Sequence, residues 1–319
     1  MNPATFSVLI KQIRLESEGT SSFELVSLTG QQLPAFTPGA HIDLHLPGGL
    51  VRSYSLLNKP SERASYRIAV KREPDSRGGS AWLHDQARVG MTLELSAPLN
   101  DFELEEEAPS SILVAGGIGI TPILSMVAHL AAAGRPWQLH YCARSRECMA
   151  FSDELELLAA NCKGVVHRYF NDSSPEPLDI QALVESAPDD AHLYCCGPAG
   201  MIEDFISASQ KRSPNTVHFE RFASSQVAAT SGGFDVHLAR DGRTLTVKNG
   251  KSILDTLLDA GLDVPYACTQ GICGSCLTRV IDGIPDHRDD CLTDEQREAN
   301  DSVIICCSGS HSQKLTLDL

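Results

Sequence analysis

Four cysteines in the last third of the chain have the type and spacing of iron-sulfur ligands. Cys268, Cys273 and Cys276 follow the pattern C-x4-C-x2-C, and Cys306 lies 30 residues further on. Four thiolates at this spacing are typical of a 2Fe-2S cluster. The two glycines inside the loop allow positive φ angles and a close approach of the backbone to the cluster. We therefore predict a 2Fe-2S site held by these four residues.

A structural zinc ion is the alternative for the same thiols, because four cysteines also form a closed tetrahedral site. Zinc ribbons usually pair two short C-x2-C knuckles. Here three cysteines share one loop and the fourth returns much later. The spacing favours the iron-sulfur cluster.

The fourth ligand is predicted to be Cys306 rather than Cys307 or Cys291. In plant-type ferredoxins the last ligand follows the third at this interval and ends a strand, which fits residues 302–308. Alternation along such a strand would turn Cys307 to the opposite face, where it would be a packed thiol. Cys291 is expected to be a bystander.

A strand end and a glycine turn in the first hundred residues predict a site for a phosphate-bearing flavin. The two motifs are Arg52-Ser53-Tyr54-Ser55 and Gly78-Gly79-Ser80. A guanidinium and the N–H groups of a glycine turn at a helix start both bind phosphate. Tyr54 would cover the isoalloxazine ring, and the Ser55 hydroxyl would orient flavin N5, which accepts hydride. Taken singly, the motifs also fit a surface pair and an ordinary turn.

A glycine-rich turn between a strand and a helix predicts a pyridine-nucleotide site. The turn is Gly116-Gly117-Ile118-Gly119-Ile120-Thr121-Pro122, which is not the strict G-x-G-x-x-G pattern. It lies where α/β sheets bind nucleotides, and its glycines permit close approach of a pyrophosphate. Thr121 is expected on the nicotinamide side. The alternative is a tight turn with no ligand.

Two further strand ends extend this predicted nucleotide site. Cys196, followed by Gly197 and Pro198, would place a small polarizable side chain beside the nicotinamide. Arg144 and Ser145 would lie near the adenosine, where they could also accept a 2′-phosphate, so charge alone does not choose between NADH and NADPH.

The chain offers no nucleophile and base at hydrolase spacing. His167 and His192 are expected to be packed or surface histidines. Hydride transfer needs no such base, because the protein mainly positions the cofactor.

Composition bounds the remaining possibilities. A length of 319 residues predicts two or three domains. The formal charge of −15 argues against nucleic acid and anionic membranes, and favours a basic protein surface as partner. Eleven cysteines without a secretory leader indicate a reducing compartment, and we expect a cytoplasmic protein. The apolar run 112–133 is long enough for a membrane span, but its glycine turn and proline favour a strand followed by a helix.

Hydrophobic periodicity divides the chain into three regions. Up to about residue 104, short alternating strands predict a small antiparallel barrel, at Phe6–Ile10, Phe23–Val26, His41–Leu46, Val51–Leu57 and Tyr66–Lys71. From residue 110 to about 222, strands alternate with helices and predict a parallel α/β sheet, at Leu113–Ala115, Ile120–Ala133, Gln138–Tyr141 and Ser152–Ala160.

The last region follows a small, polar segment, residues 223–233, that is expected to be a flexible linker. Beyond it we predict a hairpin turning at Asp241-Gly242, a helix over Ser252–Ala260 and a closing strand at Leu315–Leu317. The cysteine loop lies between this helix and the closing strand.

The three motif sets occur in a fixed order, and together they resemble the phthalate dioxygenase reductase family, which includes the vanillate demethylase reductases. The resemblance covers the whole chain. It implies an antiparallel β-barrel flavin domain at 1–104, a parallel α/β NAD-binding domain at 105–224, a linker at 225–233 and a β-grasp 2Fe-2S ferredoxin domain at 234–319.

The resemblance also implies site residues, cofactors and a partner. Ala69, Val70 and Lys71 should line the flavin, and Phe222 should pack near its ring. The absence of an insertion for an adenine group after Gly79 favours FMN over FAD. Electrons would pass from NADH through FMN and the 2Fe-2S cluster to a terminal oxygenase component, typically a Rieske non-haem iron protein acting on an aromatic acid.

Two alternative functions remain open at this point. One is a reductase that serves a separate electron carrier or another acceptor. The other is a non-catalytic zinc or thiol module attached to a nucleotide-sensing domain, which would be a colourless protein with bound zinc.

Overall fold

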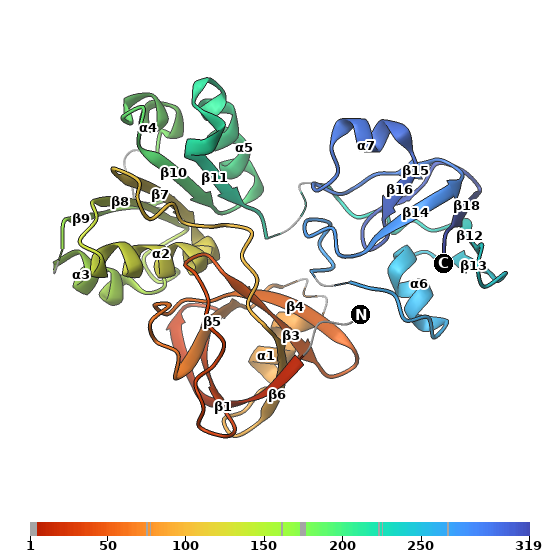
Figure 1. Ribbon diagram of the computed structural model, residues 1–319, viewed down its shortest axis with the longest axis horizontal. Coiled ribbons are helices and arrows are strands. Elements are labelled where there is room, and N and C mark those ends of the chain that lie inside the picture. The colour runs from red at the N-terminus through yellow and green to blue at the C-terminus, as the bar shows by residue number, and fades with distance from the viewer. Residues whose placement is uncertain are drawn as a thin grey trace. The chain divides into compact units, whose positions relative to one another are not determined.

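The structure is a computed structural model of the 319-residue chain, and it describes residues 5–74, 76, 78–160, 162–172, 177–222, 224, 226–266 and 268–319. The chain divides into two compact units, the first ending at Arg221 and the second running from Phe222 to Leu319. Figure 1 shows that the first unit contains two sheets, one antiparallel and one covered by helices.

The antiparallel sheet of the first unit has six strands in the order β4-β3-β6-β1-β2-β5. Alternate side chains of these strands are buried and form one core, because successive residues of a strand point to opposite faces. Among the described residues the hydrogen-bonded pairing does not close between β4 and β5. The strands are β1 (Thr5–Ser17), β2 (Thr20–Ser27), β3 (His41–Leu46), β4 (Leu50–Ser55), β5 (Ser65–Lys71) and β6 (Thr92–Ser96), with helix α1 (Gly79–Asp85) between the last two.

The second sheet is parallel, with the order β11-β10-β7-β8-β9, as the alternation of strands and helices predicts. All six residues of the central strand β7 are buried, because helices α2 and α3 cover one face and α4 and α5 the other (Figure 1). The strands are β7 (Ser111–Gly116), β8 (Trp137–Ala143), β9 (Gly164–Phe170), β10 (His192–Cys196) and β11 (Val217–Glu220). The helices are α2 (Ile120–Ala132), α3 (Ser152–Ala160), α4 (Ile180–Ser186) and α5 (Ala199–Ala208), with 3-10 turns at Gly117–Gly119, Ser209–Lys211 and Pro214–Thr216.

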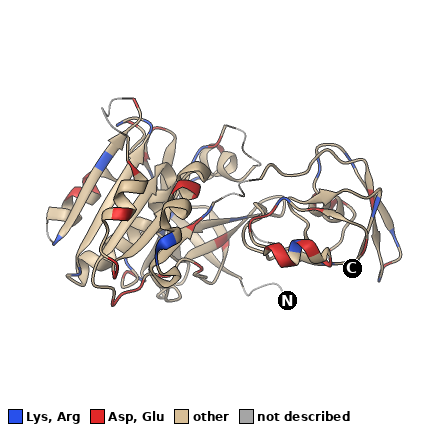
Figure 2. Cartoon of the chain, turned by 90° about the horizontal axis from the view of Figure 1, so that it is seen from above, with Lys and Arg blue, Asp and Glu red and all other residues tan. Residues whose placement is uncertain are grey.

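The apolar run between residues 112 and 133 is thus a strand, a turn and a helix of the parallel sheet. Among the residues that the structure describes, no helix is long and apolar enough to cross a membrane. Figure 2 shows Lys and Arg scattered among Asp and Glu in both units.

The second unit is built on a five-stranded sheet with the order β13-β12-β18-β14-β16, in which the first and last strands β12 and β18 pair in parallel. The predicted hairpin turns at Gly242, which has a φ of 80°. The predicted helix is α6, whose start is stabilised by a capping box between Ser252 and Asp255. The strands are β12 (Phe234–Leu238), β13 (Thr244–Val247), β14 (Leu277–Asp282), β15 (Pro285–Asp286), β16 (Ser302–Ile304), β17 (Gly309–Ser310) and β18 (Lys314–Leu317), and the helices are α6 (Ile253–Asp259) and α7 (Asp294–Ala299).

The segment expected to be a flexible linker makes hydrogen bonds within the second unit. The Ser224 N–H donates to the Gln270 carbonyl at 3.0 Å, and the Ala229 N–H donates to the Cys307 carbonyl at 2.7 Å. The Thr230 carbonyl accepts from the Gly250 N–H at 2.7 Å. These bonds hold the described part of the segment against the rest of the unit, including the cysteine loop.

Candidate functional site

The end of β4 and the start of α1 meet at Arg52 and Gly79. A Cβ atom at Gly79 would lie 2.6 Å from Arg52 Cγ, so only glycine leaves room for this side chain. Gly78 has a φ of 96°, which also favours glycine. The Arg52 side chain therefore packs against the first turn of the helix, and its guanidinium donates to the Val51 carbonyl at 2.7 Å.

Hydrogen bonds hold the neighbouring predicted flavin residues in place. Ser53 donates from Oγ to the buried Asp43 carboxylate at 2.6 Å. His84 on α1 bonds the Val70 carbonyl at 2.9 Å, which ties the helix to the strand of Ala69 and Lys71. Helix α1 thus contacts both edge strands of the sheet, β4 through Arg52 at Gly79 and β5 through His84 at Val70.

The aromatic and hydroxyl groups of β4 differ in their surroundings. Burial raises the pKa of Tyr54 to about 12, and the Arg52 guanidinium partly opposes the rise. Tyr54 therefore stays neutral at physiological pH. Ser55 is buried, with 5% of its surface exposed. Lys71 is exposed and pairs with Glu73 at 3.5 Å, so among the three β5 residues only Ala69 and Val70 are buried.

The glycine turn after β7 packs tightly against the end of β10. A Cβ at Gly119 would lie 2.2 Å from the Cys196 carbonyl oxygen, and one at Gly116 would lie 2.5 Å from Pro198 Cδ. A Cβ at Gly197 would lie 3.2 Å from Gly116 Cα. The structure therefore brings together the two strand ends that the sequence predicted as one nucleotide site.

Two members of this predicted site are fully enclosed. Thr121 is 2% exposed, and its Oγ1 donates to the Ile118 carbonyl at 3.0 Å within its own turn. Cys196 has no exposed surface, and burial raises the pKa of its thiol well above the usual value. Cys196 is thus a neutral thiol, in agreement with a contact role rather than that of a nucleophile.

The adenosine-side residues follow β8, the strand next to the glycine turn. Gly116 pairs with Cys142, two residues before Arg144. The Arg144 carbonyl accepts a hydrogen bond from the Asp172 N–H at 3.3 Å, so the end of β9 lies alongside. Arg144 is exposed and Ser145 is half-buried at this edge.

The structure adds Glu220, which sequence reasoning did not single out. It ends β11 and pairs in register with Cys196 of β10. Its Oε2 atom is buried and has no hydrogen-bond partner among the described residues. Burial, and secondarily the Asp101 carboxylate, raises the pKa of Glu220 to about 8. A glutamate two residues before Phe222, at a strand end, was the available signal.

In the second unit the four predicted cluster ligands form two pairs of thiols. The Cys268 and Cys273 thiols form a hydrogen bond with each other, and so do the Cys276 and Cys306 thiols. These hydrogen bonds raise the pKa of Cys268 and of Cys276. Cys273 is exposed and the other three are buried. No group of three or more metal-ligating side chains surrounds a single point in the described part of the chain. Cys306 also hydrogen-bonds the neighbouring Cys307 thiol.

The expectation for Cys307 was wrong in its geometry. Strand β16 ends at Ile304, so Cys306 and Cys307 lie in a turn and strand alternation does not apply to them. The Cys307 sulfur lies 2.7 Å from the place of a Cβ on Gly271, inside the cysteine loop. Cys307 is a packed thiol, 3% exposed, as expected, but it borders the predicted cluster site.

Two parts of the chain match known domain families. Residues 113–206 match the oxidoreductase NAD-binding domain, and residues 236–309 match the 2Fe-2S iron-sulfur cluster binding domain. The phenoxybenzoate dioxygenase subunit beta of Ectopseudomonas oleovorans is 50% identical over 316 residues, which are 99% of this chain and 98% of the relative. Tetrachlorobenzoquinone reductase of Sphingobium chlorophenolicum is 42% identical over 100% of this chain and 99% of the relative.

A solved structure of phthalate dioxygenase reductase, described as modular for electron transfer from pyridine nucleotides to [2Fe-2S], covers 99% of this chain and 98% of its own. The TM-score is 0.86 and the identity 37%. This chain belongs to the phthalate dioxygenase reductase family. It is an oxidoreductase with an NAD-binding domain and a 2Fe-2S domain, and the predicted fold class is confirmed.

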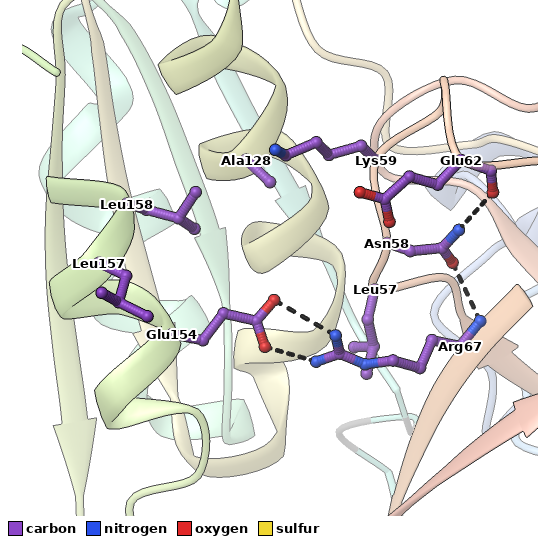
Figure 3. Close-up of a pocket in the computed structure, with 9 residues that line it drawn as sticks. All are labelled: Leu57, Asn58, Lys59, Glu62, Arg67, Ala128, Glu154, Leu157 and Leu158. Atoms are coloured by element: carbon purple, nitrogen blue, oxygen red, sulfur yellow. Dashed lines mark hydrogen bonds and ion pairs between the residues drawn. The ribbon is translucent and has the colours of Figure 1, made fainter. Parts of the chain in front are cut away.

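A cavity of about 290 Å³ in the first unit is lined by residues that belong to none of the predicted cofactor sites (Figure 3). It is bordered by the middle of α2 and by α3, not by the carboxyl ends of the strands. Arg67 of β5 bonds Glu154 of α3 across it at 2.6 Å, and Asn58 accepts from the Arg67 N–H at 2.9 Å. The cavity marks a contact that joins the two sheets of the unit.

Glu220 leads to a prediction about pH. Because its folded pKa of about 8 exceeds the usual value of 4.5, the carboxyl stabilises the fold when protonated. That contribution is complete below pH 4.5 and is lost as pH rises through 8. We expect thermal unfolding at pH 5.5, 7 and 8.5 to show a Glu220→Gln variant with a flatter pH dependence than the parent chain. The slope removed is at most about 1.4 kcal/mol per pH unit.

The control for this prediction is Glu203→Gln, which removes an exposed carboxylate on α5. It should leave the pH dependence unchanged. Equal slopes for Glu220→Gln and the parent chain would contradict the raised pKa.

Proposed function

We propose that the chain is the reductase component of a two-component Rieske-type aromatic oxygenase or demethylase. It takes electrons from NADH and passes them through FMN and the 2Fe-2S cluster to the oxygenase component. The observation that carries the proposal is the end-to-end similarity to a dioxygenase subunit and to phthalate dioxygenase reductase, together with all the predicted sites in one chain. The proposed division is a flavin domain at 1–104, an NAD-binding domain at 105–224, a linker at 225–233 and a ferredoxin domain at 234–319.

The residues around Gly79 fit FMN. Arg52 and the N–H groups of the first turn of α1 would hold its phosphate, since a Cβ is excluded between them. Tyr54 would cover the ring and the Ser55 hydroxyl would face N5, with Ala69, Val70 and Phe222 lining the ring. Phe222 begins the second unit, and its place beside the flavin stays a prediction.

The strand ends of the parallel sheet fit a dinucleotide. Gly116 and Gly117 would accept the close approach of a pyrophosphate, and Arg144 with Ser145 would contact the adenosine half. Cys196, with Gly197 and Pro198, would pack against the nicotinamide. Glu220, being largely protonated at neutral pH, can donate a hydrogen bond there.

The roles of the cofactors follow from the number of electrons that each one transfers at a time. When bound, FMN would supply the conversion between the two-electron hydride of NADH and the one-electron 2Fe-2S cluster. The chain would orient the ring through β4 and would hold the irons with Cys268, Cys273, Cys276 and Cys306. No protein group is required as a nucleophile.

The test is the visible spectrum of the purified chain, followed by anaerobic addition of NADH. We expect flavin peaks with a broad iron-sulfur shoulder, FMN rather than FAD after acid extraction, and bleaching of both chromophores by NADH. Addition of a Rieske oxygenase from the same source should then restore the oxidised spectrum. A colourless chain that binds only zinc would refute the proposal.

The choice of NADH yields a separate prediction. We expect a higher kcat/KM with NADH than with NADPH, measured by steady-state reduction of an artificial acceptor. Higher kcat/KM with NADPH would overturn the choice and would point to 2′-phosphate binding by Arg144 and Ser145.

A second candidate is a reductase that acts directly on a quinone. The observation that favours it is the similarity to the tetrachlorobenzoquinone reductase of Sphingobium chlorophenolicum. Rapid NADH-dependent reduction of a halogenated quinone without any oxygenase, and failure to reduce a Rieske oxygenase, would support this candidate instead.

A further inference from the structure

A buried carboxylate lies beside the cysteine loop and has no role in the function proposed above. Asp289 precedes Asp290, whose N–H donates to the Gly271 carbonyl at 2.9 Å. A Cβ on Gly271 would lie 3.4 Å from Asp289 Cα and 2.7 Å from Cys307 Sγ. Asp289 therefore borders the loop between the first two predicted ligands, Cys268 and Cys273.

The Asp289 side chain is fully enclosed, with 0% of its surface exposed. Its Oδ2 accepts from the Leu292 N–H at 2.8 Å and from the Cys291 N–H at 3.3 Å. Its Oδ1 is buried and has no hydrogen-bond partner among the described residues. Backbone donors of this kind stabilise an ionised carboxylate. An unpaired buried oxygen costs free energy of folding, so its presence here calls for a functional explanation.

The charges around Asp289 compensate it only in part. Arg297 of α7 lies 3.7 Å from Oδ2 and also donates to the Asp289 carbonyl at 2.7 Å. His287 lies 3.8 Å from Oδ1, but burial lowers its pKa, so it is mainly neutral at pH 7. The neighbouring Arg288 pairs with Asp286.

Asp289 also lies beside two sulfur atoms near the cysteine loop. Cys291 Sγ donates to Asp289 Oδ2 at 3.7 Å, and burial, and next the Asp289 charge, raises the pKa of Cys291 to about 12. Cys307 Sγ and Asp289 Cα both lie against Gly271 of the cysteine loop. The Asp289 charge is therefore close to the loop that carries Cys268 and Cys273.

Reduction of a 2Fe-2S cluster adds one electron and makes its net charge more negative by one. A fixed negative charge nearby opposes that step, and the opposition is strong where protein rather than water separates the charges. Net charge, hydrogen bonds and burial around the cluster are the means by which proteins set its potential.

We propose that the buried charge of Asp289 lowers the reduction potential of the 2Fe-2S cluster, and that Arg297 sets how much of that charge is offset. The inference rests on the proposed ligand set. A lower potential makes the electron easier to pass on to the oxygenase and harder to accept from the flavin.

The test is a redox titration of the full-length chain with its cluster, followed by the spectroscopic signal of the reduced cluster. Asp289→Asn keeps the size of the side chain and an oxygen for the Leu292 and Cys291 N–H groups, but removes the charge. We expect its midpoint potential to be higher than that of the parent chain. An unchanged or lower potential would overturn the proposal.

The matched control is Asp294→Asn. Asp294 pairs with the same Arg297 at 3.5 Å, but its side chain is 94% exposed. Because water screens an exposed charge, the potential should stay that of the parent chain. A shift as large as that of Asp289→Asn would overturn the assignment to the buried charge.

A second variant keeps the proposal testable if Asp289→Asn does not retain its cluster. Arg297→Gln leaves Asp289 in place but removes its compensating charge, so the potential should fall. An unchanged or raised potential in this variant would overturn the proposal. A parent chain without any iron-sulfur signal would instead refute the proposed function, so the two failures are distinguishable.

Discussion

A Cys306→Ser variant is expected to lose nearly all of the iron-sulfur absorption while keeping its flavin spectrum. Cys306 is 5% exposed and bonds Cys276, so it completes the second of the two thiol pairs. Removing one thiolate of four leaves one iron with an incomplete ligand set. Iron and sulfide content, together with the visible spectrum of the purified variant, measures the loss.

Two conservative variants serve as controls for this prediction. Cys307→Ser and Cys291→Ser should retain the cluster, because neither thiol belongs to a predicted ligand pair. Cys307 is the more demanding control, since its sulfur borders Gly271 and it also bonds Cys306. If Cys307→Ser alone loses the absorption, the assignment of the fourth ligand fails.

An Arg52→Gln variant is expected to bind FMN about ten- to a hundredfold more weakly than the parent chain. The reason is the loss of a charge-assisted bond to phosphate, which is worth roughly 1.5–3 kcal/mol. Gln also lacks the fork of N–H groups that matches a phosphate. FMN content after purification and fluorescence titration of the apoprotein give the two measurements.

Arg14→Gln is the matched control, because Arg14 is an exposed arginine of β1 in the same sheet and pairs only weakly with Glu16 at 3.7 Å. This variant removes the same charge as Arg52→Gln. Arg14 is far from the Gly79 turn in sequence and, unlike Arg52, does not pack against Gly79. FMN affinity should be unchanged. Equal affinity of Arg52→Gln and the parent chain would remove Arg52 from the flavin site.

Local patterns were sufficient where neighbours in sequence decide the structure. The Ser252 capping box begins α6, and a glycine at position 242 permits the hairpin turn that the sequence predicted. The predicted bounds of Ser152–Ala160 and His41–Leu46 agree with α3 and β3. Such elements depend on caps, turns and alternation, which are all written within a few residues.

Strand β16 shows where local patterns fail. The apolar run 302–305 suggested a strand that would continue through the two cysteines, but the strand ends at Ile304 because its partner β14 begins its pairing at Leu277. Pairing between strands that are far apart in sequence sets the length of both. The orientation of Cys307 could therefore not be deduced from alternation.

The sequence by itself identified the family, and it predicted three cofactor-binding regions and four cysteines at cluster spacing. Only the tertiary structure revealed which side chains border these sites. Glu220 lies opposite Cys196 because of the register between β10 and β11, and the Asp289 backbone packs against Gly271 of the cysteine loop. Neither residue has a motif of its own, because burial and charge proximity arise from chain segments that fold together. The cysteine spacing thus predicted the cluster site, and the folded chain placed the buried Asp289 beside its loop.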